Sequence, residues 1–166
     1  DKESGIIYVD DFFLGESHYK ETEYDKVDLE RRKDVDRRVK KYLKYVTNKK
    51  MADFGCGSGD FLREIASRCQ TACGIEFSKG FRNSLLKEHI NCLESLDDIE
   101  DKSLDIMVSF HCLEHLPNPL DILNKISKKI VSGGLILIEV PHANDFLLSK
   151  LSCEDFKQFT LWSEHL

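Results

Sequence analysis

The stretch DFGCGSGDF, residues 53–61, constrains the fold of this chain more than any other part of it. It follows a short apolar segment and precedes apolar residues at helical spacing, so we predict a strand, a glycine turn and a helix in that order. Gly55, Gly57 and Gly59 let the backbone approach a ligand closely, because glycine has no Cβ. The N–H groups that open a helix favour negative charge, so the loop predicts a site for a ligand with a carboxylate or a phosphate.

The residues that end this loop narrow the choice of ligand. A Walker A loop ends in Gly-Lys followed by Ser or Thr, whereas Asp60 and Phe61 follow Gly59 here. A dinucleotide fingerprint has a glycine three residues after its second one, and Asp60 stands at that position, counted from Gly57. Its charge would repel a pyrophosphate, while a zwitterionic amino acid tolerates it. A glycine-rich turn without a ligand remains an alternative.

A second acidic residue stands where open α/β sheets hold a ribose. Residues 71–75 are predicted to form a short buried strand, and Glu76 follows it, 21 residues after Gly55. A carboxylate at this place can accept hydrogen bonds from both ribose hydroxyls. Every cofactor with a free ribose presents that pair, so Glu76 does not distinguish between cofactors. The alternative is a solvated glutamate at the end of a strand.

Two later motifs point to a family. Residues 103–110 form a continuous β-prone run that leads into HCLEHLPNP, and GGLILIEVPH occupies residues 133–142. With the Asp-x-Gly-x-Gly-x-Gly loop, these motifs resemble class I S-adenosylmethionine-dependent methyltransferases over residues 49–142. The nearest resemblance is to ubiquinone-type O-methyltransferases and to sugar- and polysaccharide-modifying relatives. We therefore expect an α/β fold, a Rossmann-like parallel sheet of order 3-2-1-4-5 with helices on both faces.

The resemblance implies S-adenosyl-L-methionine as cofactor and S-adenosyl-L-homocysteine as product. The loop would contact the methionine part, with the first acidic residue near its ammonium group. Glu76, after the second strand, would bind the ribose. Ser95 and Leu96, after the third strand, would contact the adenine. Phe110 and His111, at the end of the fourth strand, would form the pocket floor. The expected cofactor-binding residues are Asp53, Phe54, Gly55, Cys56, Gly57, Glu76, Phe77, Ser95, Leu96, Phe110 and His111.

Methyl transfer is an in-line displacement, in which positioning supplies much of the rate. An oxygen acceptor usually also needs a general base. The candidates are His111, His115 and His142, which lie at or just past the predicted carboxyl ends of strands, although each can equally be structural. The expected acceptor is a small molecule or a glycan precursor. The alternatives are a non-catalytic methyltransferase-like binding domain and a nicotinamide-dependent oxidoreductase.

Composition and charge add further expectations. The chain of 166 residues has six cysteines and no Cys-x-x-Cys pair, which favours reduced thiols in a cytoplasmic protein and no metal site. No apolar run approaches the roughly 18 residues of a membrane span. Residues 31–50 hold ten Lys or Arg against two Asp, on a predicted amphipathic helix. We interpret this as a solvated basic face and expect no nucleic-acid partner.

We expect a single methyltransferase domain over residues 1–166. Residues 1–48 would form an N-terminal arm and the basic helix, 49–142 the cofactor-binding core, and 143–166 a truncated C-terminal segment. Relatives add two strands after the fifth strand. We expect both strands to be absent here, because we take this sequence to be a piece of a longer chain. The strand at residues 135–140 would then be an open edge, which predicts self-association there or pairing with residues 156–162.

Three further helices are predicted in the core. One covers residues 60–69, one follows Ser78 to about Lys87, and one begins at Pro119. We expect an apolar stripe on the last, ended by an entry turn at Gly133 and Gly134; its members are Leu120, Leu123, Ile126 and Ile130.

Overall fold

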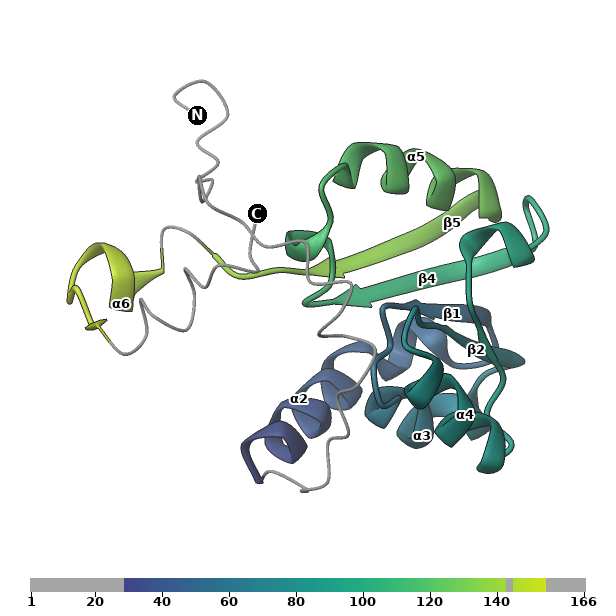
Figure 1. Ribbon diagram of the computed structural model, residues 1–166, viewed down its shortest axis with the longest axis horizontal. Coiled ribbons are helices and arrows are strands. Elements are labelled where there is room, and N and C mark those ends of the chain that lie inside the picture. Colours follow the sequence, from purple (N-terminus) through teal and green to yellow (C-terminus); the bar gives the residue numbers. More distant parts are fainter. Residues whose placement is uncertain (1–28, 143–144, 155–166) are drawn as a thin grey trace.

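The computed structural model describes residues 29–142 and 145–154, which form a parallel β-sheet flanked by helices (Figure 1). The strands pair in the order β3-β2-β1-β4-β5. This confirms the expected Rossmann-like arrangement. Asp53, near the end of β1, has Gly74 of β2 on one side and Val108 of β4 on the other. The strands are β1 (Lys50–Phe54), β2 (Thr71–Ile75), β3 (Cys92–Leu93), β4 (Leu104–Phe110) and β5 (Ile130–Glu139).

Helices cover both faces of the sheet, with α5 on one side and α2 and α3 on the other (Figure 1). Neighbouring strand residues alternate between two buried clusters: Met51 belongs to the one under α2 and α3, and Ala52 to the one under α5. A sheet buried on both faces explains the continuous apolar runs of the sequence. The helices are α2 (Leu29–Val46), α3 (Asp60–Ile65), α4 (Lys79–Lys87), α5 (Pro119–Lys129) and α6 (Phe146–Ser149), with 3₁₀ turns at residues 66–68, 96–98 and 113–115.

The structure corrects the expected end of α5 and start of β5. Ile130 opens β5 rather than closing the helical stripe, and Leu120 is 73% exposed rather than packed. Gly133 and Gly134 lie inside β5, where the ladder with β4 shifts register between Leu104 and Ile106. A Cβ at Gly134 would stand 2.4 Å from Ile130 Cγ2, so the two glycines serve an irregular strand and not a separate turn. The helix expected over residues 60–69 ends at Ile65 and continues as a 3₁₀ turn.

The strand β5 borders the sheet. Within the described residues no strand pairs with its outer edge, and the side chains of Leu135, Ile138 and Val140 are 43%, 40% and 45% exposed. Residues 156–162, expected as one partner for this edge, lie outside the described residues, as does the N-terminal arm over residues 1–28. Among the helices that are described, none combines the length and the apolar character that crossing a membrane requires.

Candidate functional site

The glycine loop curls over the carboxyl end of β2. The N–H groups of Gly55 and Cys56 both donate to the carbonyl of Ile75, at 2.9 and 3.3 Å. Gly55 and Gly57 have φ of +73° and +55°, in the left-handed region that favours glycine. A Cβ at Gly55 would lie 2.3 Å from the sulfur of Cys112, whereas one at Gly57 would meet nothing within 4 Å. The loop is therefore tightly packed on one side and open to a ligand on the other.

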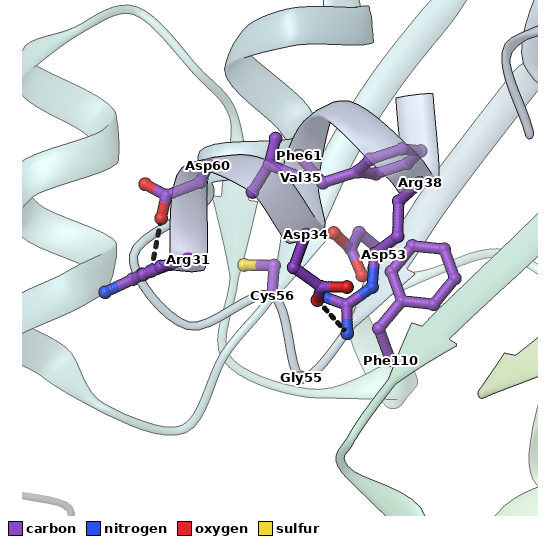
Figure 2. Close-up of a pocket in the computed structure, with 10 residues that line it drawn as sticks. All are labelled: Arg31, Asp34, Val35, Arg38, Asp53, Gly55, Cys56, Asp60, Phe61 and Phe110. Carbon is purple, nitrogen blue, oxygen red and sulfur yellow. Dashed lines mark ion pairs between the residues drawn. The ribbon is translucent and has the colours of Figure 1, made fainter. Parts of the chain in front are cut away.

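A cavity of about 90 Å³ lies between this loop and α2 (Figure 2). The first turns of α2 form one wall, and the loop, the start of α3 and the end of β4 form the others. The lining residues are Arg31, Asp34, Val35, Arg38, Asp53, Gly55, Cys56, Asp60, Phe61 and Phe110. The helix interpreted as a solvated basic face thus places two of its arginines in a cavity wall, and the Arg38 side chain is only 14% exposed.

Both acidic and basic side chains line this cavity. Asp53 is buried, with 3% of its surface exposed. Burial raises the pKa of its carboxyl to about 7; the negative charge of Glu76 acts in the same direction and the positive charge of Arg38 against it. Arg38 lies across the cavity and bonds Asp34, with 2.8 Å between Nη2 and Oδ2. The cavity therefore offers a carboxyl group and a guanidinium together, the complement of a zwitterionic amino acid.

Glu76 is held in place by backbone donors. Its Oε2 accepts from the N–H of Gly57 at 2.8 Å, and its Oε1 accepts from the N–H of Ser78 at 2.7 Å. A carboxylate oxygen has a second lone pair, so both oxygens can still accept from a ligand. Arg82 supports this turn, because its Nη1 donates to the Glu76 carbonyl at 2.8 Å. The loop and the acid at the end of β2 thus form one hydrogen-bonded unit.

The other expected cofactor residues take different positions. Phe54 is half-buried and packs on the cluster under α5, and Leu96 is 4% exposed within that cluster. Ser95 Oγ accepts the N–H of Asp97 as part of a capping box, and Phe77 is 54% exposed. These residues do not line the cavity of Figure 2. The expected contacts of Ser95 and Leu96 with adenine, and of Phe54 and Phe77 with the cofactor, stay predictions.

Of the three candidate histidines, His111 lies between two carboxylates. It follows β4 with a left-handed φ of +51°, and its N–H donates to the Glu139 carbonyl at 2.8 Å. Its Nδ1 is 3.2 Å from Glu114 Oε1, and its Nε2 is 3.9 Å from Glu139 Oε1. The second carboxylate oxygen of Glu114 is buried and bonds nothing within the described part of the chain. His115 lies in the following 3₁₀ turn, and His142 is exposed beyond β5.

Glu139 is a residue of this region that the sequence analysis did not single out. At the end of β5 it binds Arg37 through both oxygens, Arg38 Nε at 3.0 Å and the Tyr42 hydroxyl at 3.1 Å. Burial acts to raise the pKa of Glu139, but the hydrogen bonds from Arg37 and Arg38 outweigh it and lower the pKa to about 2. Arg38 also lies 4.9 Å from the ring centroid of Phe110. Glu139 thus fastens α2 over the cavity.

Comparison with known proteins identifies the family. A family model described as a methyltransferase domain matches residues 27–165. The chain is a member of the methyltransferase domain family. This confirms the resemblance to class I S-adenosylmethionine-dependent methyltransferases drawn from the motifs.

Curated relatives of this methyltransferase domain include ubiquinone biosynthesis O-methyltransferases. The protein from Pseudomonas entomophila is 25% identical over 145 residues, which cover 72% of this chain and 61% of the relative. The protein from Idiomarina loihiensis is 28% identical over 109 residues, 58% of this chain and 44% of the relative. The chain therefore spans roughly half to three fifths of the length of these relatives.

Solved structures show the same fold. A SAM-dependent methyltransferase from Archaeoglobus fulgidus superimposes with a TM-score of 0.66 and 24% identity, over 81% of this chain and 61% of that one. The [4+2]-cyclase SpnF gives a TM-score of 0.56 and 16% identity, over 66% of this chain and 49% of that one. Since the second protein is a cyclase, the fold by itself does not determine the reaction.

Proposed function

We propose that this methyltransferase domain binds S-adenosyl-L-methionine and transfers its methyl group to a small-molecule acceptor, with S-adenosyl-L-homocysteine as product. The observation that carries the proposal is the cavity in which Asp53 and Arg38 stand beside the glycine loop. The ammonium of the cofactor's amino-acid end would lie near Asp53 and its carboxylate near Arg38. When bound, the cofactor supplies an electrophilic methyl group.

Residues of the cavity wall and of the adjoining loop would bind and orient the cofactor. The open face of Gly57 permits its close approach, and Gly55 and Cys56 connect Gly57 to the cavity wall. Glu76, fixed by two backbone N–H groups, would accept the ribose hydroxyls. We keep the remaining predicted contacts as part of the proposal; they are Phe54 and Phe77 with the cofactor, Ser95 and Leu96 with the adenine, and Phe110 and His111 at the pocket floor.

His111 is the residue we propose as general base. Its Nδ1 faces Glu114, so a proton on Nδ1 would be held there and Nε2 would be left to accept a proton from the acceptor. Glu114 would act through the histidine as a positioning residue. The left-handed backbone of His111 is a costly conformation of the kind that functional sites retain.

The acceptor class and the cell compartment rest on different observations. The ubiquinone biosynthesis O-methyltransferases among the relatives favour a small molecule over a glycan precursor. All six cysteines, each within the described residues, are free thiols, which supports a cytoplasmic protein.

The cofactor assignment is tested by the substitution Glu76→Ala. We expect it to weaken binding of S-adenosyl-L-homocysteine by about 1.5–3 kcal/mol, roughly 10- to 150-fold, because a charge-assisted bidentate contact is lost. Isothermal calorimetry measures the affinity. Glu100→Ala is the matched control, since Glu100 is an exposed acid beyond the 3₁₀ turn at residues 96–98.

Two outcomes would contradict this assignment. Unchanged affinity in a folded Glu76→Ala protein would show that Glu76 does not bind the ribose. Tight binding of NADH by the wild-type chain, without binding of S-adenosyl-L-homocysteine, would favour the oxidoreductase alternative.

We also infer that two copies associate through the outer edge of β5. The apolar residues Leu135 and Ile138 are exposed beside backbone groups that no described strand pairs. We expect light scattering to report dimers or larger species that dissociate in Ile138→Lys, because a charge on an edge strand blocks strand addition. Lys125→Glu, on the exposed surface of α5, is the control. A monomeric wild-type chain would refute the inference.

A further inference from the structure

Two thiols meet beneath the glycine loop. The sulfur atoms of Cys56, in the loop, and Cys92, at the start of β3, are 3.8 Å apart. The strand β2 lies between the two elements, and they come together over Gly74. A Cβ at Gly74 would stand 2.5 Å from the Cys56 sulfur and 3.0 Å from the Cys92 sulfur. The missing side chain of Gly74 is therefore what allows the sulfurs to meet.

We propose that Cys56 and Cys92 are a site of reversible oxidation, at which a hydroperoxide such as hydrogen peroxide forms a disulfide that closes the cofactor loop. A disulfide bond is about 2.05 Å long, so the sulfurs must approach by roughly 1.8 Å from their separation of 3.8 Å. Cys56 lines the cavity wall, where a molecule as small as hydrogen peroxide can enter (Figure 2). Cys92 is 7% exposed.

The contact between the two thiols favours a thiolate within the pair. Either sulfur can donate the hydrogen bond that joins them, and the sulfur that accepts it is stabilised as a thiolate. This thiolate is the nucleophile. It attacks one oxygen of hydrogen peroxide, the O–O bond breaks, and hydroxide leaves and takes up the proton released when the thiolate formed.

The second step forms the bridge. The second sulfur of the pair attacks the sulfur of the sulfenic acid, the S–O bond breaks, and the oxygen leaves as water with the proton of the second thiol. In total two thiols lose two electrons and two protons, and one hydrogen peroxide becomes two waters. A dithiol such as dithiothreitol reverses the oxidation by exchange.

The bridge would act on the loop that faces the cofactor. The backbone of Cys56 takes part in two loop contacts, its N–H donating to Ile75 and its carbonyl accepting from Gly59 at 2.9 Å. Next to it, the Gly57 N–H bonds Glu76. Drawing the sulfur toward β3 pulls on these contacts together. This expectation rests on the proposed cofactor site. The oxidised protein should bind S-adenosyl-L-homocysteine at least tenfold more weakly than the reduced protein.

The test treats the reduced chain with hydrogen peroxide and measures intact mass, disulfide-linked peptides and calorimetric affinity. We expect a loss of about two hydrogens, a peptide joining Cys56 to Cys92, and weakened binding that dithiothreitol restores. In Cys92→Ala the linked peptide and the peroxide effect should vanish, while its reduced form keeps its affinity. Cys73→Ser is the matched control, because Cys73 adjoins Gly74 but packs on the opposite face of the sheet.

Each contrary result has a separate meaning. Disulfides among other cysteines, or none, would overturn the pair as an oxidation site. A Cys56–Cys92 bridge that leaves the affinity unchanged would overturn its control of the loop. Failure of the reduced protein to bind S-adenosyl-L-homocysteine would instead refute the proposed function, while the mass measurement would still decide the disulfide.

Discussion

Replacing Asp53 by asparagine is expected to stabilise the ligand-free protein above pH 7 and to remove most of its affinity for S-adenosyl-L-homocysteine. Asp53 is buried, and its pKa of about 7 shows that ionising it in the folded state is unfavourable. The rise of the pKa from its usual 3.8 to about 7 corresponds to roughly 4 kcal/mol. The same charge is what would attract the ammonium of the cofactor, so binding should weaken at least tenfold.

The sign of the pH dependence follows from proton binding. Between pH 4 and 7 the folded protein holds the Asp53 proton, while the unfolded chain, with a pKa near 3.8, has released it. The free energy of unfolding therefore falls as pH rises through this range and stays low above it. Denaturant unfolding at pH 5 and pH 8 should show this loss in the wild type and not in Asp53→Asn.

A control and a ligand titration complete this test. Asp121→Asn, at an exposed position of α5, should leave the pH dependence unchanged. In the wild type, affinity for S-adenosyl-L-homocysteine should rise with pH through 7, as Asp53 ionises. An equal pH dependence of stability in wild type and Asp53→Asn would show that another group is responsible.

The strands and the loop could be predicted from sequence because their causes are local. The apolar run 103–110 is buried on both faces as β4, and the glycines at 55, 57 and 59 all adopt positive φ. The order of the strands follows from the short crossover connections. The start of β5 could not be predicted, since Gly133 and Gly134 suit a turn and a bulged strand equally well.

The contribution of α2 to the site was missed for a different reason. Basic residues on an amphipathic helix usually face solvent, and composition alone cannot show which of them lie over a ligand cavity. The helix did carry a signal. Arg31 and Arg38 follow the spacing of Val35, Tyr42 and Val46, so they extend the buried stripe and not the exposed face. A charged residue within a buried apolar stripe predicts a residue of opposite charge nearby. For Arg38 that residue is Glu139.

Replacing Gly55 by alanine is expected to cost about 3 kcal/mol of folding free energy and to abolish measurable cofactor binding. The left-handed φ of +73° alone costs an alanine roughly 1–2 kcal/mol. The new Cβ would also stand 2.3 Å from the sulfur and 2.7 Å from the Cβ of Cys112, far inside contact distance. The Cβ of Cys112 is fixed to its own backbone, so turning the sulfur away cannot relieve the clash and the backbone must shift.

Gly57→Ala separates the two causes, because Gly57 has a similar φ of +55° but its Cβ would meet nothing within 4 Å. We expect the free energy of unfolding of this variant, measured in urea, to fall only by the cost of the backbone conformation, about 1 kcal/mol. Adding Cys112→Ala to Gly55→Ala removes the sulfur at 2.3 Å but leaves the Cβ of residue 112 at 2.7 Å, so it should restore part of the lost stability and no more. If Gly55→Ala and Gly57→Ala proved equally stable, the contact with Cys112 would not be what requires glycine at position 55.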